Sequence, residues 1–433
     1  MKIGVIGLGY VGLPSAVGFA ELGFHVIGTD SNLTHLKKLK DGHSPLYEPG
    51  LQTLLTKHLE SGLLEFKESI ADVVNDTYII FICVGTPQYN SGQTDLSYVK
   101  QAVTSIAKNL REYRIIVEKS TVPVNTADWI RETINNYSNS KIDFDVASNP
   151  EFLRESSAID DFLNPDRIVL GVESEKAEKS LTELYNSFNC PIFITDLKTV
   201  EIIKHASNSF LAMRISFINM IADLCEVTGA DVTKVSEGMG LDPRIGQDYL
   251  EAGIGYGGYC LPKDIRAFIH IGEELGVNFS LLNQVEYINN ERLDRLIGKL
   301  RNQLGEIKNK QIGILGLSFK PGTDDIRMSP GINIVKKLNN MGAILKLHDP
   351  KAMENTRNEL KNLTDLTFCE SAYDVSINSD SLIVLTGWSE YKNLDLNRLG
   401  SRMAKRIMID GRNLFEPNKV RDSGFIYHSV GRS

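Results

Sequence analysis

The sequence lacks the features that mark several classes of protein. Its 433 residues include only five cysteines and no CxxC spacing, so neither a disulfide framework nor a structural zinc site is expected. No apolar run reaches the roughly 18 residues of a membrane helix. The net charge of -8 leaves no basic excess for binding nucleic acid through its phosphates. We therefore expect a cytoplasmic globular protein that holds no metal and binds neither membranes nor nucleic acid.

The length indicates more than one domain, because single cores rarely grow beyond about 250–300 residues. In the first part, strand-like runs alternate with helical patterns, and this alternation predicts a doubly wound α/β domain with a parallel sheet. The first 28 residues are expected to form a strand and a helix rather than a signal peptide. The predicted strands are Lys2–Ile6, His25–Thr29, Tyr78–Cys83 and Ile115–Glu118.

The middle and last parts have different patterns. Apolar residues at three- and four-residue steps predict one long helix over Thr199–Thr228, with further helices at Lys263–Leu275 and Ser280–Leu300. A second βα alternation opens at Gln311–Leu315, and its Ile312–Gly316 resembles Ile3–Gly7, although a complete GxGxxG is missing. The fold class is thus α/β, with two Rossmann-like domains joined by a central long-helix region. The expected domains are 1–198, 199–300 and 301–433, with a linker at Arg301–Lys310.

A dinucleotide site is predicted at the amino end of the chain. The segment Gly7-Leu8-Gly9-Tyr10-Val11-Gly12 directly follows a strand and opens a helix, so its glycines allow a tight turn and close approach to a pyrophosphate. Asp30 ends the next predicted strand, eighteen residues after Gly12, where a carboxylate accepts both ribose hydroxyls of adenosine. Because that charge would repel a 2′-phosphate, NAD is favoured over NADP.

Two threonines follow predicted strands at the ligand edge of the same sheet. Thr86 lies in Val84-Gly85-Thr86-Pro87, and Thr121 lies in Lys119-Ser120-Thr121-Val122-Pro123. Either hydroxyl could bind cofactor or substrate, and either could equally serve a turn or cap a helix.

Cys260 differs from the other four cysteines, for which burial as small apolar side chains is expected. It follows the glycine-rich run Gly253–Gly258 and precedes a predicted helix, whose dipole would stabilise a thiolate. Lys263 adds positive charge nearby. These features predict a reactive thiol.

The long helix carries Lys204 and Asn208 four residues apart, so both side chains leave the same face. Together they could hold a developing oxyanion, or they could be a lysine and an asparagine that only pack between helices. Asn149–Glu155 supplies two glutamates for acid, base or water-holding roles. Arg244, Lys320 and Arg327 stand in glycine-containing loops and offer cations for phosphate groups.

Taken together, these motifs resemble one family, the UDP-glucose/GDP-mannose dehydrogenases. The resemblance runs through nearly the whole chain in the family's order. The matching segments are Gly7–Gly12, Tyr47–Gly50, Val84–Pro87, Lys119–Pro123, Ser148–Glu155, Lys204–Asn208, Gly255–Asp264 and Phe319–Arg327.

The resemblance implies a reaction and a role for each site residue. Cys260 is the expected nucleophile, Lys204 and Asn208 the oxyanion donors, and Asp264 with Thr121 and a water the proton carriers, while Glu151 assists thioester hydrolysis. Two NAD molecules would be consumed as UDP-glucose becomes UDP-glucuronate, in a homodimer. The implied cofactor contacts are Gly7, Gly9, Tyr10, Val11, Gly12, Asp30, His35, Thr86, Thr121, Glu155, Lys263 and Arg327. The implied nucleotide-sugar contacts are Glu151, Phe152, Leu153, Arg154, Glu155, Lys204, Asn208, Arg244, Tyr249, Leu250, Glu251, Ala252, Gly253, Gly257 and Lys320.

The sequence departs from the family pattern at His35, where many members have lysine, which would weaken a contact to the adenosine side of NAD. Asp242–Gly246 and Asn164–Val169 resemble the UDP-glucose branch, with GDP-mannose as the alternative substrate. Other interpretations are a two-electron hydroxy-acid dehydrogenase, which leaves Cys260 unexplained, and a non-catalytic nucleotide-sugar sensor, which would tolerate Cys260→Ser.

Overall fold

The computed structural model describes residues 1–138 and 142–432. The chain divides into two compact units: one comprises Met1–Ser207 and Arg266–Val277, and the other comprises Asn208–Ile265 and Asn278–Ser433. Each unit contains one sheet with helices on both faces, and a long helix begins in the first unit and continues into the second. The predicted fold class, two Rossmann-like domains joined by a long helix, is confirmed.

The N-terminal unit is built on an eight-stranded sheet of order β3-β2-β1-β4-β5-β6-β7-β8. All neighbouring pairs are parallel except β6 and β7. The order 3-2-1-4-5 is that of a dinucleotide-binding fold, whose ligands lie at the carboxyl ends of the strands. Its strands are β1 (Lys2–Ile6), β2 (His25–Thr29), β3 (Leu64–Phe66), β4 (Ile79–Ile82), β5 (Ile115–Glu118), β6 (Asp145–Ser148), β7 (Ile168–Gly171) and β8 (Ile192–Thr195).

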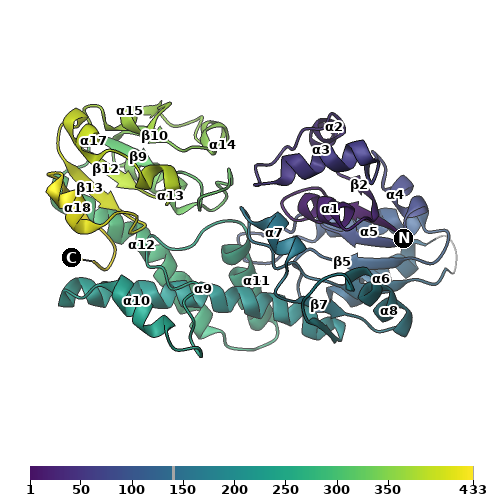
Figure 1. The fold of residues 1–433 in the computed structure, drawn as a ribbon. Coiled ribbons are helices and arrows are strands. Elements are labelled where there is room, and N and C mark those ends of the chain that lie inside the picture. Colours follow the sequence, from purple (N-terminus) through teal and green to yellow (C-terminus); the bar gives the residue numbers. More distant parts are fainter. Residues whose placement is uncertain (139–141, 433) are drawn as a thin grey trace. The chain divides into compact units, whose positions relative to one another are not determined.

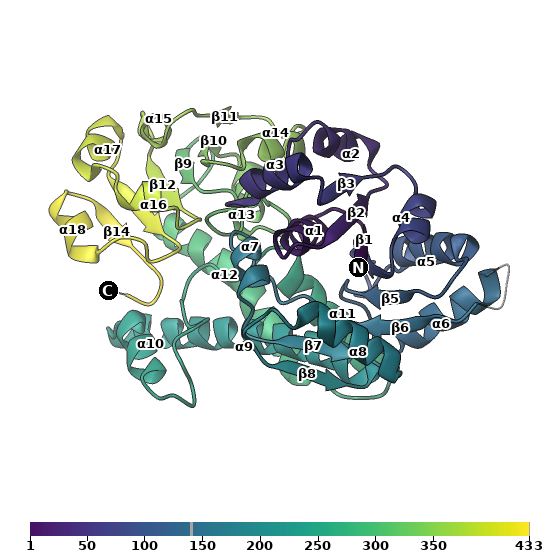
Figure 2. The ribbon, with the colours of Figure 1, turned by 45° about the vertical axis from the view of Figure 1, so that its right-hand side comes forward.

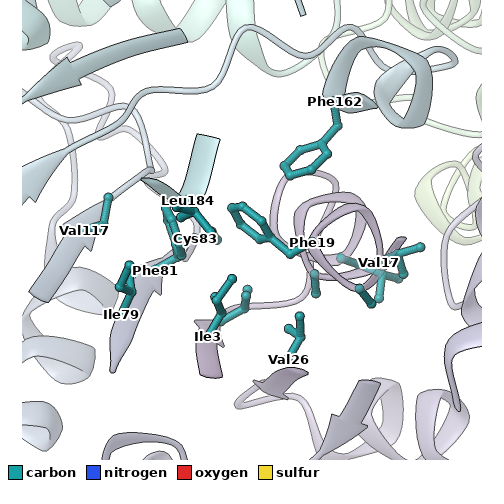
Figure 3. Close-up of a cluster of buried hydrophobic side chains, with 14 of the residues drawn as sticks. Ile3, Val17, Phe19, Val26, Ile79, Phe81, Cys83, Val117, Phe162 and Leu184 are labelled. Atoms are coloured by element: carbon teal, nitrogen blue, oxygen red, sulfur yellow. The ribbon is translucent and has the colours of Figure 1, made fainter. Parts of the chain in front are cut away.

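Alternate residues of these strands point to opposite faces, and each face has its own core. Ile79 and Phe81 of β4 pack with α1, α3, α7 and α8, whereas Ile80 and Ile82 pack with α4, α5 and α6. Figure 3 shows Phe19 of α1 pointing towards the strands that carry Ile3 and Phe81. The helices are α1 (Gly12–Glu21), α2 (Leu33–Lys40), α3 (Leu51–Ser61), α4 (Ile70–Asp76), α5 (Ser97–Asn109), α6 (Thr126–Tyr137), α7 (Ala158–Leu163) and α8 (Glu175–Tyr185). Figure 2 shows α8 beside β7 and β8.

The central region consists of helices, the longest of which is α9 (Leu197–Thr228), an unbroken run of 32 residues (Figure 1). The others are α10 (Val232–Gly240), α11 (Cys260–Glu274) and α12 (Ser280–Leu304). Helix α11 begins three residues before the predicted start, at Cys260 itself, because Pro262 lies in the first turn, where a missing backbone N–H costs nothing.

The linker predicted at Arg301–Lys310 is wrong at its start, since α12 continues through Leu304. Leu300 and Leu304 lie one turn apart and both pack into the core of the C-terminal sheet, as does Ile307. Because these apolar residues are buried, α12 continues into a segment whose charged residues favour a linker in the sequence.

The second unit contains a six-stranded parallel sheet of order β11-β10-β9-β12-β13-β14, which has the full 3-2-1-4-5-6 order of a Rossmann fold. Its strands are β9 (Gln311–Leu315), β10 (Ile344–His348), β11 (Leu366–Phe368), β12 (Ser381–Val384), β13 (Ile407–Asp410) and β14 (Ile426–His428). Its helices are α13 (Pro330–Asn340), α14 (Met353–Glu359), α15 (Ala372–Ser376), α16 (Ser389–Lys392), α17 (Leu396–Arg402) and α18 (Pro417–Asp422).

The two Rossmann sheets share one detail at the end of their first strand. Gly7 and Gly316 both have positive φ, 92° and 97°, and each donates its backbone N–H to the last residue of the second strand. In each sheet an aspartate directly follows this last residue of the second strand, but the two aspartates have different surroundings. Asp30 is half-buried, whereas the buried Asp349 carboxylate accepts hydrogen bonds from the Ser318 hydroxyl and the Trp388 indole. The second copy therefore holds its acidic group within the protein instead of presenting it to a ribose.

Within the described part of the chain, none of the helices combines the length and apolar character needed to cross a membrane.

Candidate active site

The glycines of the first loop have separable physical roles. A Cβ at Gly12 would lie 1.8 Å from the Gly7 carbonyl oxygen, and one at Gly7 would lie 2.7 Å from the Cys83 carbonyl oxygen. These two positions exclude any side chain because of the fold itself. A Cβ at Gly9, by contrast, would meet no atom within 4 Å. The space beside Gly9 at the start of α1 is where a pyrophosphate can approach the backbone, so the loop fits a dinucleotide.

Asp30 is fixed at the end of β2 next to this loop. Its Oδ2 accepts from the Leu8 backbone N–H at 2.7 Å, and its Oδ1 accepts from Asn32 at 2.8 Å. Tyr10 and Val11 complete the turn, and Val11 directly precedes α1. His35 lies in the first turn of α2, where its backbone N–H is capped by Asn32. The predicted adenosine contacts thus lie on neighbouring elements at one sheet edge.

The two predicted threonines also lie at this edge. Thr86 is buried in the loop after β4, and Thr121 is half-buried in the loop after β5. The β5 loop is held by a neighbouring helix, since His205 contacts the Val122 carbonyl at 3.0 Å. Glu201 accepts from the backbone N–H groups of Asn125 and Ala127 at the start of α6.

A third loop, residues 149–157, follows β6 and contains both predicted glutamates. Glu48, itself buried, holds the far end of this loop by accepting from the backbone N–H groups of Ser156 and Ala158, each at 2.8 Å. Ser156 has φ 71°, so this anchoring keeps a strained residue in place. Arg154 and Glu155 are in the same loop, and Arg154 is paired with Asp161.

Glu151 forms a buried ion pair with Lys204 of α9. The distance from Lys204 Nζ to Glu151 Oε1 is 2.9 Å, and the two side chains are 5% and 4% exposed. Glu151 Oε2 accepts from the Leu153 backbone N–H. The Lys204 ammonium also lies 5.3 Å from the Phe152 ring centroid. Because both side chains are shielded from water, the low local dielectric strengthens their attraction. Removing either partner would leave an unpaired buried charge and destabilise the protein.

One turn further along α9, Asn208 contributes to a second buried cluster. Its amide donates to Asp264 Oδ2, and Lys263 donates to Asp264 Oδ1, both at 2.5 Å. Asp264 is fully buried, and Lys263 is 5% exposed. Cys260 is the first residue of α11, the helix that carries Lys263 and Asp264, and it is half-buried. Cys260 is thus placed at the amino end of a helix, the position where helix dipoles favour negative charge.

Of the remaining cysteines, Cys83, Cys225 and Cys369 are buried as expected, whereas Cys190 is only half-buried, at the edge of a core cluster. Burial raises the pKa of the Cys83 thiol to about 12, and burial likewise raises the pKa of Cys190, Cys225 and Cys369. The reactive thiol predicted at Cys260 is thus distinguished by its position at a helix start.

The segment leading to Cys260 is held from the central helices. Asn219 of α9 accepts from the Gly253 backbone N–H, and Asn289 of α12 bonds both backbone groups of Tyr256. Gly257 admits no side chain, because a Cβ there would lie 2.6 Å from the Met328 carbonyl oxygen. Tyr249 has φ 61°.

The side chains at the start of this segment differ in exposure. Leu250 and Ala252 are buried in a core cluster, whereas Glu251 is exposed. The backbone carbonyls of Leu250 and Ala252 accept from the side chains of Ser236 and Asn413.

The three predicted cations have different surroundings. Arg244 is 88% exposed and bonds Asp242 in its own loop. Arg327 is paired with Asp325 and lies over the Tyr259 ring at 4.4 Å, next to the Cys260 segment. Lys320 Nζ lies 5.8 Å from the centroid of the Phe319 ring.

Several residues of this site were not predicted as functional: Glu48, Asn149, Asn219 and Asn289. Glu48 and Asn149 lie in motifs that the sequence displays, but their partners are long-range and invisible to local patterns. No sequence signal marks Asn219 or Asn289 beyond a polar residue within an apolar helix.

Comparison with known proteins identifies this arrangement. Sequence profiles of three domains match in order: the family's NAD binding domain over residues 1–189, its central domain over 198–291 and its UDP binding domain over 313–417. The chain belongs to the UDP-glucose/GDP-mannose dehydrogenase family. It is therefore an NAD-dependent oxidoreductase.

Individual relatives match over the full chain. The sequence is 42% identical to a UDP-glucose 6-dehydrogenase of Bacillus subtilis, covering 100% of this chain and 93% of that protein. It is also 42% identical to one from Rhizobium meliloti, with 100% of both covered. Among solved structures, a UDP-glucose dehydrogenase from Pyrobaculum islandicum matches with a TM-score of 0.94 at 38% identity, covering 100% of this chain and 98% of that one.

Proposed function

We propose that this dehydrogenase oxidises UDP-glucose to UDP-glucuronate in two successive hydride transfers through a covalent adduct on Cys260. The observation that carries the proposal is Cys260 at the start of α11, the helix whose Asp264 is bonded to Asn208 and Lys263. Oxidation of an alcohol to a carbonyl needs no nucleophile, so a thiol in such surroundings points to oxidation up to the carboxylate. The names of the full-length relatives support UDP-glucose as the substrate.

The cofactor would be held by the first sheet. The backbone at Gly9 would receive the pyrophosphate, and the Asp30 carboxylate would accept from the adenosine ribose, with Thr86 and Thr121 on adjoining loops. His35, Glu155, Lys263 and Arg327 are the remaining proposed contacts. When bound, NAD supplies the hydride acceptor at its nicotinamide ring.

The nucleotide sugar would be held by several loops. Lys320 and Arg244 would meet the phosphates, and the backbone of 249–253 with Gly257 would line the nucleotide, leaving the loop 151–155 for the sugar.

In the first oxidation the C6 hydroxyl loses its proton towards Asp264, through Thr121 and a water, while a hydride leaves C6 and an aldehyde forms. The Cys260 thiolate then adds to the aldehyde carbon, making a carbon–sulfur bond. The oxyanion of this thiohemiacetal is stabilised by the Lys204 ammonium and the Asn208 amide.

The second hydride leaves the same carbon and produces a thioester. Glu151 would take a proton from the water that attacks this thioester, because its carboxylate is held by Lys204 and Leu153. The carbon–sulfur bond then breaks, releasing the carboxylate and restoring the thiolate. One water is consumed, and two hydrides are transferred in total.

The substrate is tested by initial rates with UDP-glucose or GDP-mannose as the sole sugar, following NADH absorbance and identifying the product by mass spectrometry. We expect UDP-glucose to give the larger kcat/KM, by at least a factor of about 10, and UDP-glucuronate as product. A preference for GDP-mannose would overturn the substrate while leaving the dehydrogenase class intact.

We also propose that the protein forms a homodimer through α9. One face of the helix presents large apolar side chains at steps of three, four and seven residues, and these are 41–86% exposed: Phe210, Phe217, Met220, Leu224 and Val227. An exposed apolar stripe of this size marks a protein interface.

The dimer is tested by light scattering of Phe217→Asp and Leu224→Asp, which are expected to lower the mass to that of a monomer. Ile426→Asp, at an exposed apolar residue outside α9, is the matched control and should leave the dimer intact. A monomeric wild type at micromolar concentration would refute the dimer.

A further inference from the structure

We propose that Lys119 is a positioning residue that fixes the Asn149–Glu151 turn. The inference deepens the proposed function, because it concerns how Glu151 is held for thioester hydrolysis. Lys119 is not one of the predicted cofactor or substrate contacts.

The geometry begins with Lys119 as the residue directly after β5, buried at 5% exposure. Its ammonium donates to the Asn149 side-chain oxygen at 2.9 Å and lies 3.4 Å from the Asn149 carbonyl oxygen. Asn149 stands two residues before Glu151. The Lys119 ammonium thus holds the start of the turn that carries Glu151.

Asn149 is fixed by three other contacts. Its side-chain oxygen also accepts from the Tyr185 hydroxyl at 2.6 Å, and its amide donates to the Val169 carbonyl at 3.0 Å. Its backbone N–H donates to the Glu118 carbonyl at 2.9 Å. With Pro150 next in the chain, little freedom is left in the backbone that delivers Glu151.

The surroundings of Lys119 keep its side chain within the protein. Its ammonium lies 6.0 Å from the centroid of the Phe81 ring of β4. Burial lowers the pKa of Lys119 to about 8, while the nearby Glu151 carboxylate raises it and the nearby Lys204 ammonium lowers it.

The Lys119 ammonium is thus a buried link between the end of β5 and the turn that carries Glu151. Loss of this ammonium should therefore leave the turn less constrained, without changing any group proposed to touch the sugar.

The test uses three variants whose kcat and KM on UDP-glucose are compared with those of the wild type. Lys119→Met removes the donor to Asn149, and Lys119→Arg keeps a cationic donor. The matched control is Arg114→Met, a buried cation at the opposite end of the same strand, which bonds the Val74 and Asn75 carbonyls. This substitution destabilises the same sheet, but Arg114 lies away from the edge where ligands are expected.

For Lys119→Met we expect kcat to fall by about tenfold, because Glu151 is held less well, with the KM for UDP-glucose within about twofold of wild type. Lys119→Arg and Arg114→Met should keep kcat within about twofold of wild type. An unchanged kcat in Lys119→Met, or an equal fall in Arg114→Met, would overturn the inference, as would failure of Lys119→Met to fold when Arg114→Met folds. If the wild type does not oxidise UDP-glucose at all, it is the proposed function that fails.

Discussion

Replacement of Asp264 by asparagine should be among the most damaging single changes in the second unit. Asp264 is fully buried and accepts from both the Asn208 amide and the Lys263 ammonium. An asparagine can turn its oxygen towards Asn208, but its NH2 group then faces the Lys263 ammonium, so two donors meet in a site that excludes water. Breaking a buried charge pair in this way costs about 3–5 kcal/mol.

The assay is chemical denaturation followed separately for the two units, because a chain of two units need not unfold in one step. The double variant Lys263→Met with Asp264→Asn removes the cation as well as the anion, so it should recover about 1–3 kcal/mol relative to Asp264→Asn alone. A loss below about 0.5 kcal/mol for Asp264→Asn, or strict additivity in the cycle, would refute the reasoning. Activity should fall by at least about 100-fold, because Asp264 is also the proposed proton acceptor.

Three further predictions concern the N-terminal unit. Gly9→Ala should fold normally and lose NADH affinity in a fluorescence titration, whereas Gly12→Ala should fail to fold, because its Cβ would lie 1.8 Å from the Gly7 carbonyl oxygen. Phe19→Ala should cost about 3–5 kcal/mol in thermal unfolding, since Phe19 is fully buried and packs at 5.0 Å against two other rings. Burial raises the pKa of Glu118 to about 8, so between about pH 5 and 8 the folded state holds a proton that the unfolded state has lost. Stability should therefore fall as pH rises, by about 1.4 kcal/mol per pH unit, and Glu118→Gln should remove this slope in unfolding measured across pH; an unchanged slope would contradict it.

The features that the sequence predicts well are those encoded by neighbouring residues. Strand β1, the glycine loop and the start of α1 are contiguous, and the helix α9 follows from apolar residues at helical spacing. Cys260 is recognisable because glycines precede it and charge follows it. In each case a window of about twenty residues contains the whole signal.

The features that could not be predicted depend on distant partners. The Asn208–Asp264 bond joins residues 56 positions apart, and the contact between Glu48 and Ala158 spans 110. Burial of Lys119 is likewise set by β4, β6 and α9, although a lysine after a strand ordinarily faces water. The same limit explains the linker error, since only the packing of Leu304 against the second sheet extends α12.

The central claim, a four-electron oxidation through Cys260, is tested most directly by counting the NADH formed per UDP-glucose when the sugar is limiting. The account predicts two NADH and UDP-glucuronate for the wild type, and fewer than two for Cys260→Ser, which cannot form the thiohemiacetal. One NADH for the wild type, or two for Cys260→Ser at an undiminished rate, would contradict it.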